Sequence, residues 1–251
     1  MIKLDKVSKR FGTGVFGLSN VSLSINKGEF VFLVGPSGSG KTSIFRLLIR
    51  DILPTEGVIM VNDWDVVKLP NSKIPHLRKK VGMVFQDLKL LADRTIFENV
   101  ALPLEIAGIA VSDAKKKVDD VLKQVGLEGH EDKFPIQLSG GELQRAAIAR
   151  ALVLSPDILL ADEATGNLDV NTSWEILKLL SDINERGTTI LMATHNLDIV
   201  KNLQKRVVEM EKGHLVKDSK HRKTTHSEEE HEEKHYHSKH AEVKEESDEV
   251  R

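Results

Sequence analysis

Residues 30–42 read FVFLVGPSGSGKT, and this stretch decides the fold of the chain. Its first five residues form an unbroken apolar run, which is the pattern of a strand buried on both faces of a sheet. Glycines and small residues follow, and a helical pattern then covers about residues 41–49. We therefore predict a central strand that passes through a glycine-rich loop into a helix.

The loop itself matches the pattern GxxxxGK[ST], in which glycines let several backbone N–H groups turn toward one phosphate. The helix that follows adds the positive end of its dipole. We expect Lys41 to reach the terminal phosphates of a nucleoside triphosphate and the Thr42 hydroxyl to bind Mg²⁺. A glycine-rich turn without a ligand is the alternative, but the flanking strand and helix favour a phosphate loop. The predicted binding residues are Gly35, Pro36, Ser37, Gly38, Ser39, Gly40, Lys41 and Thr42.

Further buried strands are predicted on either side of this unit, at residues 81–85, 158–161 and 188–193, with helices at 142–154 and 173–184. Strands that alternate with helices indicate an α/β fold with a mostly parallel sheet and helices on both faces. Residues 2–8 and 21–25 alternate apolar and polar side chains, as strands near a sheet edge do. Residues 95–127 have a helical pattern and predict a helical insert.

Composition narrows the choice of function. The 251 residues carry a net charge of −2, which argues against a protein that coats nucleic acid. Cysteine is absent, so disulfides, thiolate metal sites and cysteine nucleophiles are excluded. No apolar run approaches the roughly 20 residues of a membrane span, and the first residues have no apolar signal core. We therefore expect any membrane contact to pass through another chain.

Acidic residues end the strand at 158–161. Ligands of such sheets bind at the carboxyl ends of the strands, where Asp162 and Glu163 lie. We expect Asp162 to hold Mg²⁺, through a water molecule, and Glu163 to act as general base for the attacking water. Adjacent carboxylates at a strand end are also common as caps, so the pair gains its meaning from the phosphate loop.

Two further polar residues end neighbouring strands. His195 follows the strand at 188–193 and is expected to hold either the attacking water or Glu163 in line with the phosphate. Gln86 follows the strand at 81–85, and its amide is expected to bind Mg²⁺ and contact the same water. The predicted catalytic residues are therefore Glu163, His195 and Gln86, and the predicted metal ligands are Thr42, Gln86 and Asp162.

Residues 138–143 read LSGGEL and predict a second anion site. Ser139 can cap the helix that follows, and Gly140 and Gly141 leave backbone N–H groups open to a phosphate. A capped helix start without a ligand is the alternative. The helical insert separates this site from the phosphate loop, so one ATP cannot easily use both in one chain. Two copies that face each other head to tail would solve this problem.

These motifs, in this order and rough spacing, resemble the ABC ATPase superfamily over residues 1 to about 217. The resemblance implies a P-loop NTPase core of the RecA type with an antiparallel β subdomain and a helical insert at about 88–150. It also implies ATP and Mg²⁺ as ligands and a homodimer formed on ATP binding. Within it, Ser139, Gly140, Gly141, Glu142 and Asp169 would contact ATP at the dimer interface, and Phe11 would stack on adenine, with Phe16 as a weaker candidate.

Within the superfamily the chain most resembles the FtsE family of cell-division ATP-binding proteins. The resemblance rests on residues 75–87, 90–95 and 134–142. It implies a membrane subunit of the FtsX type, a peripheral place on the cytoplasmic face of the membrane, and control of cell-wall hydrolysis. An ATPase of the lipoprotein-release or macrolide-export type is the alternative. Leu143 and Ala164 depart from the superfamily pattern, where glutamine and proline are usual, but neither change removes a phosphate ligand.

The partner's coupling helix would dock near residues 88–99, where Leu90, Leu91 and Phe97 either line the docking surface or belong to the core. Residues 218–251 are rich in His, Glu and Lys, and we predict a disordered tail. Six histidines of this tail would suit Zn²⁺, Cu²⁺ or Ni²⁺ only if the tail adopted an ordered structure. These histidines are His221, His226, His231, His235, His237 and His240.

Overall fold

The computed structural model describes residues 1–12, 14, 16–196, 200 and 203–220. The chain divides into two compact units, Met1–Lys217 and Asp218–Arg251, and of the second unit only residues 218–220 are described. The predicted disorder of the tail and its histidines from His221 onward lie outside the described residues. The domain limits at 217 and at about 88–150 stay predictions.

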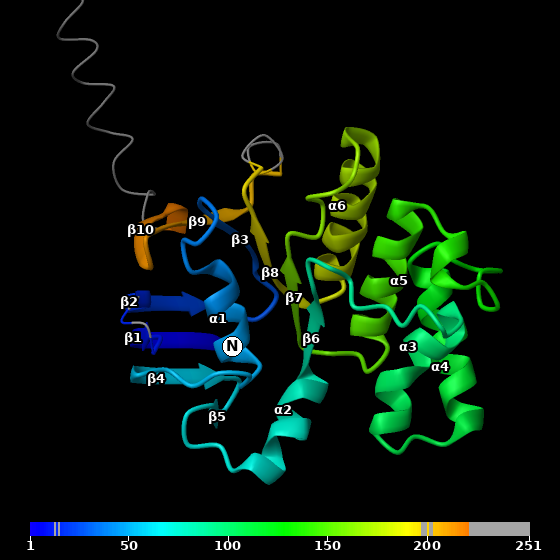
Figure 1. Cartoon of the computed structure of the whole chain (residues 1–251), viewed down its shortest axis with the longest axis horizontal. Helices are drawn as coiled ribbons and strands as arrows, with labels where there is room; N and C mark the ends of the chain where they lie inside the picture. The colour runs from blue at the N-terminus through cyan, green and yellow to red at the C-terminus, as the bar shows by residue number, and fades with distance from the viewer. Residues whose placement is uncertain (13, 15, 197–199, 201–202, 221–251) are drawn as a thin grey trace, which may run out of the picture. The chain divides into compact units, whose positions relative to one another are not determined.

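A parallel sheet is the centre of the first unit (Figure 1). The four strands that the sequence predicted for this sheet, which begin at Phe30, Val81, Ile158 and Thr189, pair in parallel as expected. A fifth strand, which was not predicted, pairs in parallel with the one that begins at Phe30. In the described part of the chain this sheet has 6 strands. In spatial order these are β10 (His214–Asp218), β9 (Arg206–Glu211), β3 (Phe30–Val34), β8 (Thr189–Thr194), β7 (Ile158–Asp162) and β6 (Val81–Val84).

Alternate side chains of these strands enter two separate cores, one on each face of the sheet. On β3, Phe30 and Phe32 belong to one hydrophobic cluster, whereas Val31 and Leu33 belong to the other. All of them are almost fully buried, as strands covered on both faces require. The two clusters define which helices lie on which side of the sheet.

Helix α1 (Lys41–Leu48) and an antiparallel sheet cover the face toward which Val31 and Leu33 point. Ile44 and Phe45 of α1 pack there together with Leu4 of the antiparallel sheet. That sheet has the order β2-β1-β4-β5. Its strands are β1 (Ile2–Arg10), β2 (Phe16–Ile25), β4 (Glu56–Val61) and β5 (Trp64–Asp65). Helix α2 (Ile74–Lys80), preceded by the 3-10 turn η1 (Asn71–Lys73), adds Leu77 to the same core.

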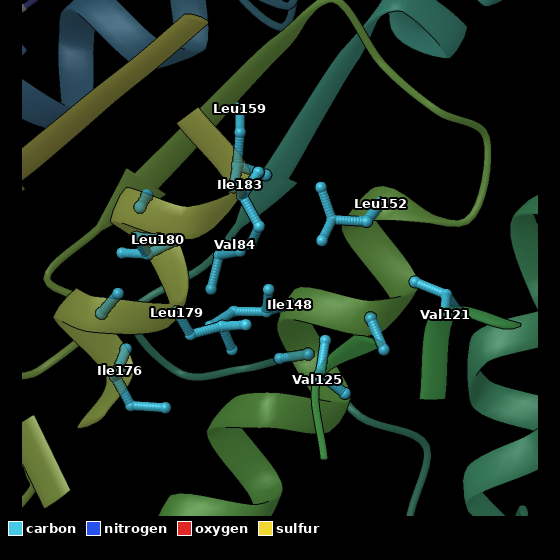
Figure 2. Packing of buried hydrophobic residues seen from close by; sticks show 14 of the residues in the cluster. Val84, Val121, Val125, Ile148, Leu152, Leu159, Ile176, Leu179, Leu180 and Ile183 are labelled. Carbon is cyan, nitrogen blue, oxygen red and sulfur yellow. The ribbon is translucent and has the colours of Figure 1, made fainter. Parts of the chain in front are cut away.

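Four helices of the described part of the chain lie on the opposite face: α3 (Ile96–Ile106), α4 (Val111–Gln124), α5 (Gly140–Leu152) and α6 (Val170–Glu185). A 3-10 turn, η2 (Pro135–Gln137), precedes α5. Figure 2 shows side chains from β6, β7, α5 and α6 gathered in one cluster, among them Val84, Ile148 and Leu180. The helix with the phosphate loop and the helix with the LSGGE motif therefore lie on opposite faces of one sheet.

Capping residues explain where the helices differ from the sequence pattern. Helix α5 begins at Gly140 and α6 at Val170, earlier than the expected 142 and 173, because Ser139 and Asp169 cap them. The helical pattern over 95–127 is broken into α3 and α4 around Gly108, whose φ is +75°. The strands β9 and β10 were not predicted from the sequence. No helix in the described ranges is both long and apolar enough to cross a membrane.

Candidate functional site

A cavity of about 680 Å³ opens where the parallel strands end. Pairing aligns Val34 with Thr194 and Asp162 with Ala193, so the loops after β3, β7 and β8 leave the same edge of the sheet. Most of the predicted site residues line this cavity. They are Phe11, Pro36, Ser37, Gly38, Gly40, Lys41, Thr42, Gln86, Glu163 and His195, together with Phe16, Gly17 and Ser43.

Two glycines of the phosphate loop cannot carry a side chain. A Cβ on Gly40, which has φ +107°, would lie 2.6 Å from the Gly17 carbonyl oxygen. A Cβ on Gly35 would lie 2.2 Å from the carbonyl oxygen of Met210 on β9. Gly35 and Ser39 do not line the cavity but pack beneath it, where Ser39 is buried. The tight loop therefore depends on its fit against β2 and β9.

The start of α1 is open to an anion. Gly40 precedes the helix without a side-chain cap, and no acidic residue lies in the first turn. The first N–H groups of a helix have no acceptor within the helix, so they favour a negative ligand at this point. Lys41 Nζ meanwhile donates hydrogen bonds to the carbonyl oxygens of Gly35, at 2.7 Å, and Pro36, at 3.0 Å.

Two effects act on the pKa of Lys41 in opposite directions. Burial lowers the pKa of its ammonium group, while the nearby carboxylates of Glu163 and Asp162 act in the opposite direction. Burial also raises the pKa of Asp162, although a hydrogen bond from the Thr42 hydroxyl works against that shift. Asp162 itself is buried behind Thr42 and does not line the cavity.

The donor set next to the cavity fits Mg²⁺. Thr42, Asp162 and Gln86 offer a hydroxyl, a carboxylate and an amide oxygen, which are the hard ligands that this ion prefers. Within the described ranges, no group of three or more His, Cys, Asp or Glu residues could hold a metal by itself. An ion here would therefore need ligands from elsewhere, and the phosphates of a nucleotide supply such oxygens.

Glu163 is held in a strained backbone conformation. Its φ of +49° is unusual for a residue with a side chain and costs about 1–3 kcal/mol. Its N–H donates to the carbonyl of Ala193 at 3.0 Å, and its own carbonyl accepts from Gly166 at 2.9 Å. Its carboxylate lies 3.3 Å from Nδ1 of His195. The strained turn thus brings the predicted base beside the predicted histidine, at the mouth of the cavity.

The two aromatic candidates for base stacking both border the cavity. Phe11 lies 5.5 Å from the Lys9 ammonium, and Phe16, which is 46% exposed, stacks with the Arg10 guanidinium at 4.4 Å. A Cβ on Gly17 would lie 2.5 Å from the Phe11 ring, so glycine is needed there for the ring to keep its place. The sequence offered no pattern that singled out Gly17.

The LSGGE motif does not reach this cavity in the same chain. Ser139 forms a capping box at the start of α5: the Glu142 carboxylate accepts from the N–H of Ser139 at 2.8 Å and from its hydroxyl at 2.7 Å. His130 Nε2 lies 3.0 Å from the other oxygen of Glu142. The hydrogen bonds from Ser139, with a smaller contribution from His130, lower the pKa of Glu142 to about 2.

Asp169 lies beside this helix start, on the loop before α6. Its carboxylate accepts from the N–H of Thr172 at 3.0 Å and from the Thr172 hydroxyl, and both hydrogen bonds lower its pKa. A Cβ on Gly141 would lie 2.6 Å from Cγ2 of Thr172. The start of α5 and the start of α6 therefore touch. The predicted residues Ser139, Gly140, Gly141, Glu142 and Asp169 do not line the cavity.

Comparisons with known proteins identify relatives of the chain. The family model described as ABC transporter matches residues 18–166. The cell division ATP-binding protein FtsE of Bacillus subtilis is 49% identical over 218 residues, which cover 87% of this chain and 96% of that protein. The protein of the same name from Mycobacterium tuberculosis is 48% identical over 219 residues, covering 87% of this chain and 95% of that protein.

Among solved structures, a dimeric post-hydrolysis state of the ATP-binding cassette MJ0796, bound to ADP and Pi, has a TM-score of 0.79. It is 35% identical to the chain, and the match covers 87% of this chain and 97% of that one.

Proposed function

This chain belongs to the ABC transporter family, and from that premise we propose that it is the ATP-hydrolysing subunit of a membrane complex of the FtsEX type. Its ATP-driven dimerisation would be coupled to cell division and to the control of cell-wall hydrolysis. The single observation that supports this best is that α1 and α5, whose starts are both predicted to bind anions, lie on opposite faces of one sheet. One nucleotide can use both only if two copies contribute.

We assign the roles of the cavity residues from their contacts. On nucleotide binding, Lys41 exchanges the carbonyls of Gly35 and Pro36 for the oxygens of the terminal phosphates. Thr42, Asp162 and Gln86 would hold Mg²⁺, which would neutralise part of the phosphate charge when bound. Glu163 then accepts the proton of the attacking water. His195, at 3.3 Å from the Glu163 carboxylate, fixes the direction of that carboxylate.

A second copy completes the site in this proposal. Ser139 and the N–H groups of Gly140 and Gly141 would close on the terminal phosphate held by the other copy. Asp169, beside them, would lie between the two copies. The solved cassette MJ0796, 35% identical, is described as dimeric with ADP and Pi bound, and that description supports the same arrangement here.

We propose a membrane subunit of the FtsX type as the partner, which would place the chain at the cytoplasmic face of the membrane. The family resemblance to the curated FtsE proteins supports this assignment. Of the residues expected at the docking surface, Leu91 is 37% exposed, whereas Leu90 and Phe97 pack against the core. Leu91 is therefore the better candidate for contact with the partner.

Replacing Glu163 with Gln tests the catalytic assignment. We expect ATP hydrolysis to fall by at least about 100-fold, because a general base typically contributes that much. The variant should also accumulate as an ATP-bound dimer in sedimentation experiments with Mg²⁺, whereas the parent returns to monomers as it hydrolyses ATP. Hydrolysis at the parent's rate would disprove the role of Glu163, and a strictly monomeric Glu163→Gln variant would disprove the two-copy site.

Isolation of the native complex from membranes tests the partner. An FtsX-type membrane protein that copurifies with the chain supports the division role. A lipoprotein-release or macrolide-export permease in its place would overturn that role and leave the ATPase assignment intact.

A further inference from the structure

We infer that Arg150 is a positioning residue for hydrolysis, which fixes the loop carrying Gln86 to α5, the helix that Ser139 caps. The inference rests on the proposed function, because Gln86 and Ser139 are assigned to ATP there. It concerns a side chain outside the cavity, since Arg150 does not line it. Arg150 lies near the end of α5, far along the helix from the LSGGE motif.

The contacts of Arg150 are directed at one short segment. Its two terminal nitrogens donate to neighbouring carbonyl oxygens, Nη2 to Leu88 at 2.5 Å and Nη1 to Lys89 at 2.6 Å. A guanidinium is planar and holds two parallel donors in a fixed fork, so it can bind both carbonyls at once. Helix α5 is thereby attached to the loop that follows β6.

That segment holds Gln86 in a tight turn. The N–H of Leu88 donates to the carbonyl of Phe85 at 3.0 Å, so Gln86 and Asp87 are the central residues of the turn. The carbonyl of Leu88, the last residue of the turn, is one of the two that Arg150 binds. The place of the Gln86 side chain in the cavity thus depends on a turn whose far end is held from α5.

The backbone held by Arg150 is strained. Leu88 and Lys89 have φ values of +57° and +55°, and two consecutive residues with side chains in the left-handed region are costly. Such conformations persist only where surrounding contacts hold them. The N–H of Lys89 donates to the carbonyl of Asp87, and its ammonium pairs with the Asp87 carboxylate at the exposed surface. Arg150 ties the carbonyls of this strained segment to helix α5, while the Leu88 side chain packs against the hydrophobic core.

Within the described residues, the guanidinium of Arg150 binds backbone carbonyls and not carboxylates. In the part of the chain that the structure describes, no Asp or Glu lies within ion-pair distance of its guanidinium. Burial accordingly lowers its pKa. A partly buried cation that binds only carbonyls is a poor source of stability, because hydrogen bonds alone offset its desolvation. Its use for fixing a backbone segment next to the site accounts for its position.

Arg145 provides a matched control on the same helix. Its guanidinium also bridges α5 to other parts of the chain, through the carbonyl of Val125 at 3.1 Å and the carboxylate of Glu175 at 2.8 Å. It does not contact residues 85–89. Arg150→Gln and Arg145→Gln therefore remove the same chemical group from α5, but only the first removes the link to Gln86.

The experiment compares hydrogen exchange, ATP affinity and turnover in these variants. For Arg150→Gln without nucleotide, we expect exchange in residues 86–90 to speed up about tenfold, and in Arg145→Gln to stay at the parent's rate. For Arg150→Gln we also expect kcat to fall about tenfold while the Kd for ATP stays within about twofold, because the phosphate loop does not contact Arg150. Arg150→Lys keeps the positive charge but loses the two parallel donors of the guanidinium, and its kcat should lie between those of the parent and Arg150→Gln.

Unchanged exchange in residues 86–90, or an equal increase in Arg145→Gln, would overturn the inference. So would a loss of ATP affinity that matches the loss of kcat, since that pattern reports general damage to the fold. If Arg150→Gln does not fold, Arg150→Lys decides the question by the same measurements. The exchange measurement needs no hydrolysis, so an inactive parent protein would disprove the proposed function and leave the link between Arg150 and the loop standing.

Discussion

The starts of α1 and α5 are both predicted to bind phosphate, yet they are built in opposite ways. Helix α1 has neither a side-chain cap nor an acidic residue in its first turn, so its positive end is free for a ligand. Helix α5 has a complete capping box, and the Glu142 carboxylate already lies at its positive end. The first helix start is suited to take an anion, whereas the second already has one.

This difference suggests the order in which the two helix starts bind ATP. The α1 start also has the Lys41 ammonium beside it, which donates hydrogen bonds to two carbonyls of its own loop until a phosphate replaces them. The α5 start offers a neutral hydroxyl, that of Ser139, which donates to Glu142. We infer that ATP binds first at α1 of one copy and that α5 of the second copy adds a weaker contact. Three variants test that order, beginning with the largest expected effect.

Lys41→Met should abolish tight binding of ATP by the single chain. Lys41 is buried, and methionine fills a similar space without the charge. Hydrogen bonds to charged groups contribute about 1.5–3 kcal/mol each, so the Kd for ATP should rise by roughly 100-fold. Equilibrium binding of a fluorescent ATP analogue measures this change. Affinity within tenfold of the parent would show that the α1 start does not depend on its lysine and would remove the proposed order.

Ser139→Ala should act on the second step only. We expect the Kd for ATP of the single chain to stay within about twofold, because Ser139 does not line the cavity. In the Glu163→Gln background, ATP-driven dimerisation should weaken by about tenfold, the value of one hydrogen bond to a charged group. Sedimentation at increasing protein concentration measures it.

Thr95→Ala is the matched control for Ser139→Ala. Thr95 and Glu98 form an equivalent capping box at the start of α3, so the variant loses the same kind of cap, about 1 kcal/mol of stability. It should leave dimerisation unchanged. Equal weakening in both variants would mean that loss of the cap, and not of a phosphate contact, explains the effect at Ser139.

Prediction from the sequence succeeded where a local sequence pattern determines the local structure. The run before Gly35 could only be a strand buried on both faces, and β3 is buried throughout. The glycine pattern then located the cavity, because the loop conformation and the ligand chemistry require the same residues. Glu163, His195 and Gln86 could be placed beside it because they follow buried strands of one parallel sheet, whose carboxyl ends meet at one edge.

It failed where a feature depends on residues far apart in the chain. Strands β9 and β10 are joined by Lys212 and Gly213, which both have positive φ, but a Lys-Gly turn is a weak signal beside Asn-Gly. Gly17 is required only because the Phe11 ring packs on it. The link from Arg150 to Leu88 spans 62 positions in the sequence, and no local pattern marks it. Such contacts are set by packing and require the structure.

The smallest effect expected is the pH dependence of stability at the α5 start. The hydrogen bonds from Ser139 lower the pKa of Glu142 from 4.5 to about 2, so the folded chain binds this proton less tightly than the unfolded chain. Stability from Glu142 is therefore present above pH 4.5 and is lost as pH falls toward 2. Glu142→Gln should thus be slightly less stable than the parent at pH 6, and the difference should shrink as the pH falls from 4.5 to about 2, as measured by urea unfolding. Glu185→Gln, at the exposed end of α6, controls for loss of a charge away from any cap.

A difference that stays constant over this pH range would show that the hydrogen bonds from Ser139 do not keep Glu142 ionised. The α5 start would then be as open to an anion as the α1 start.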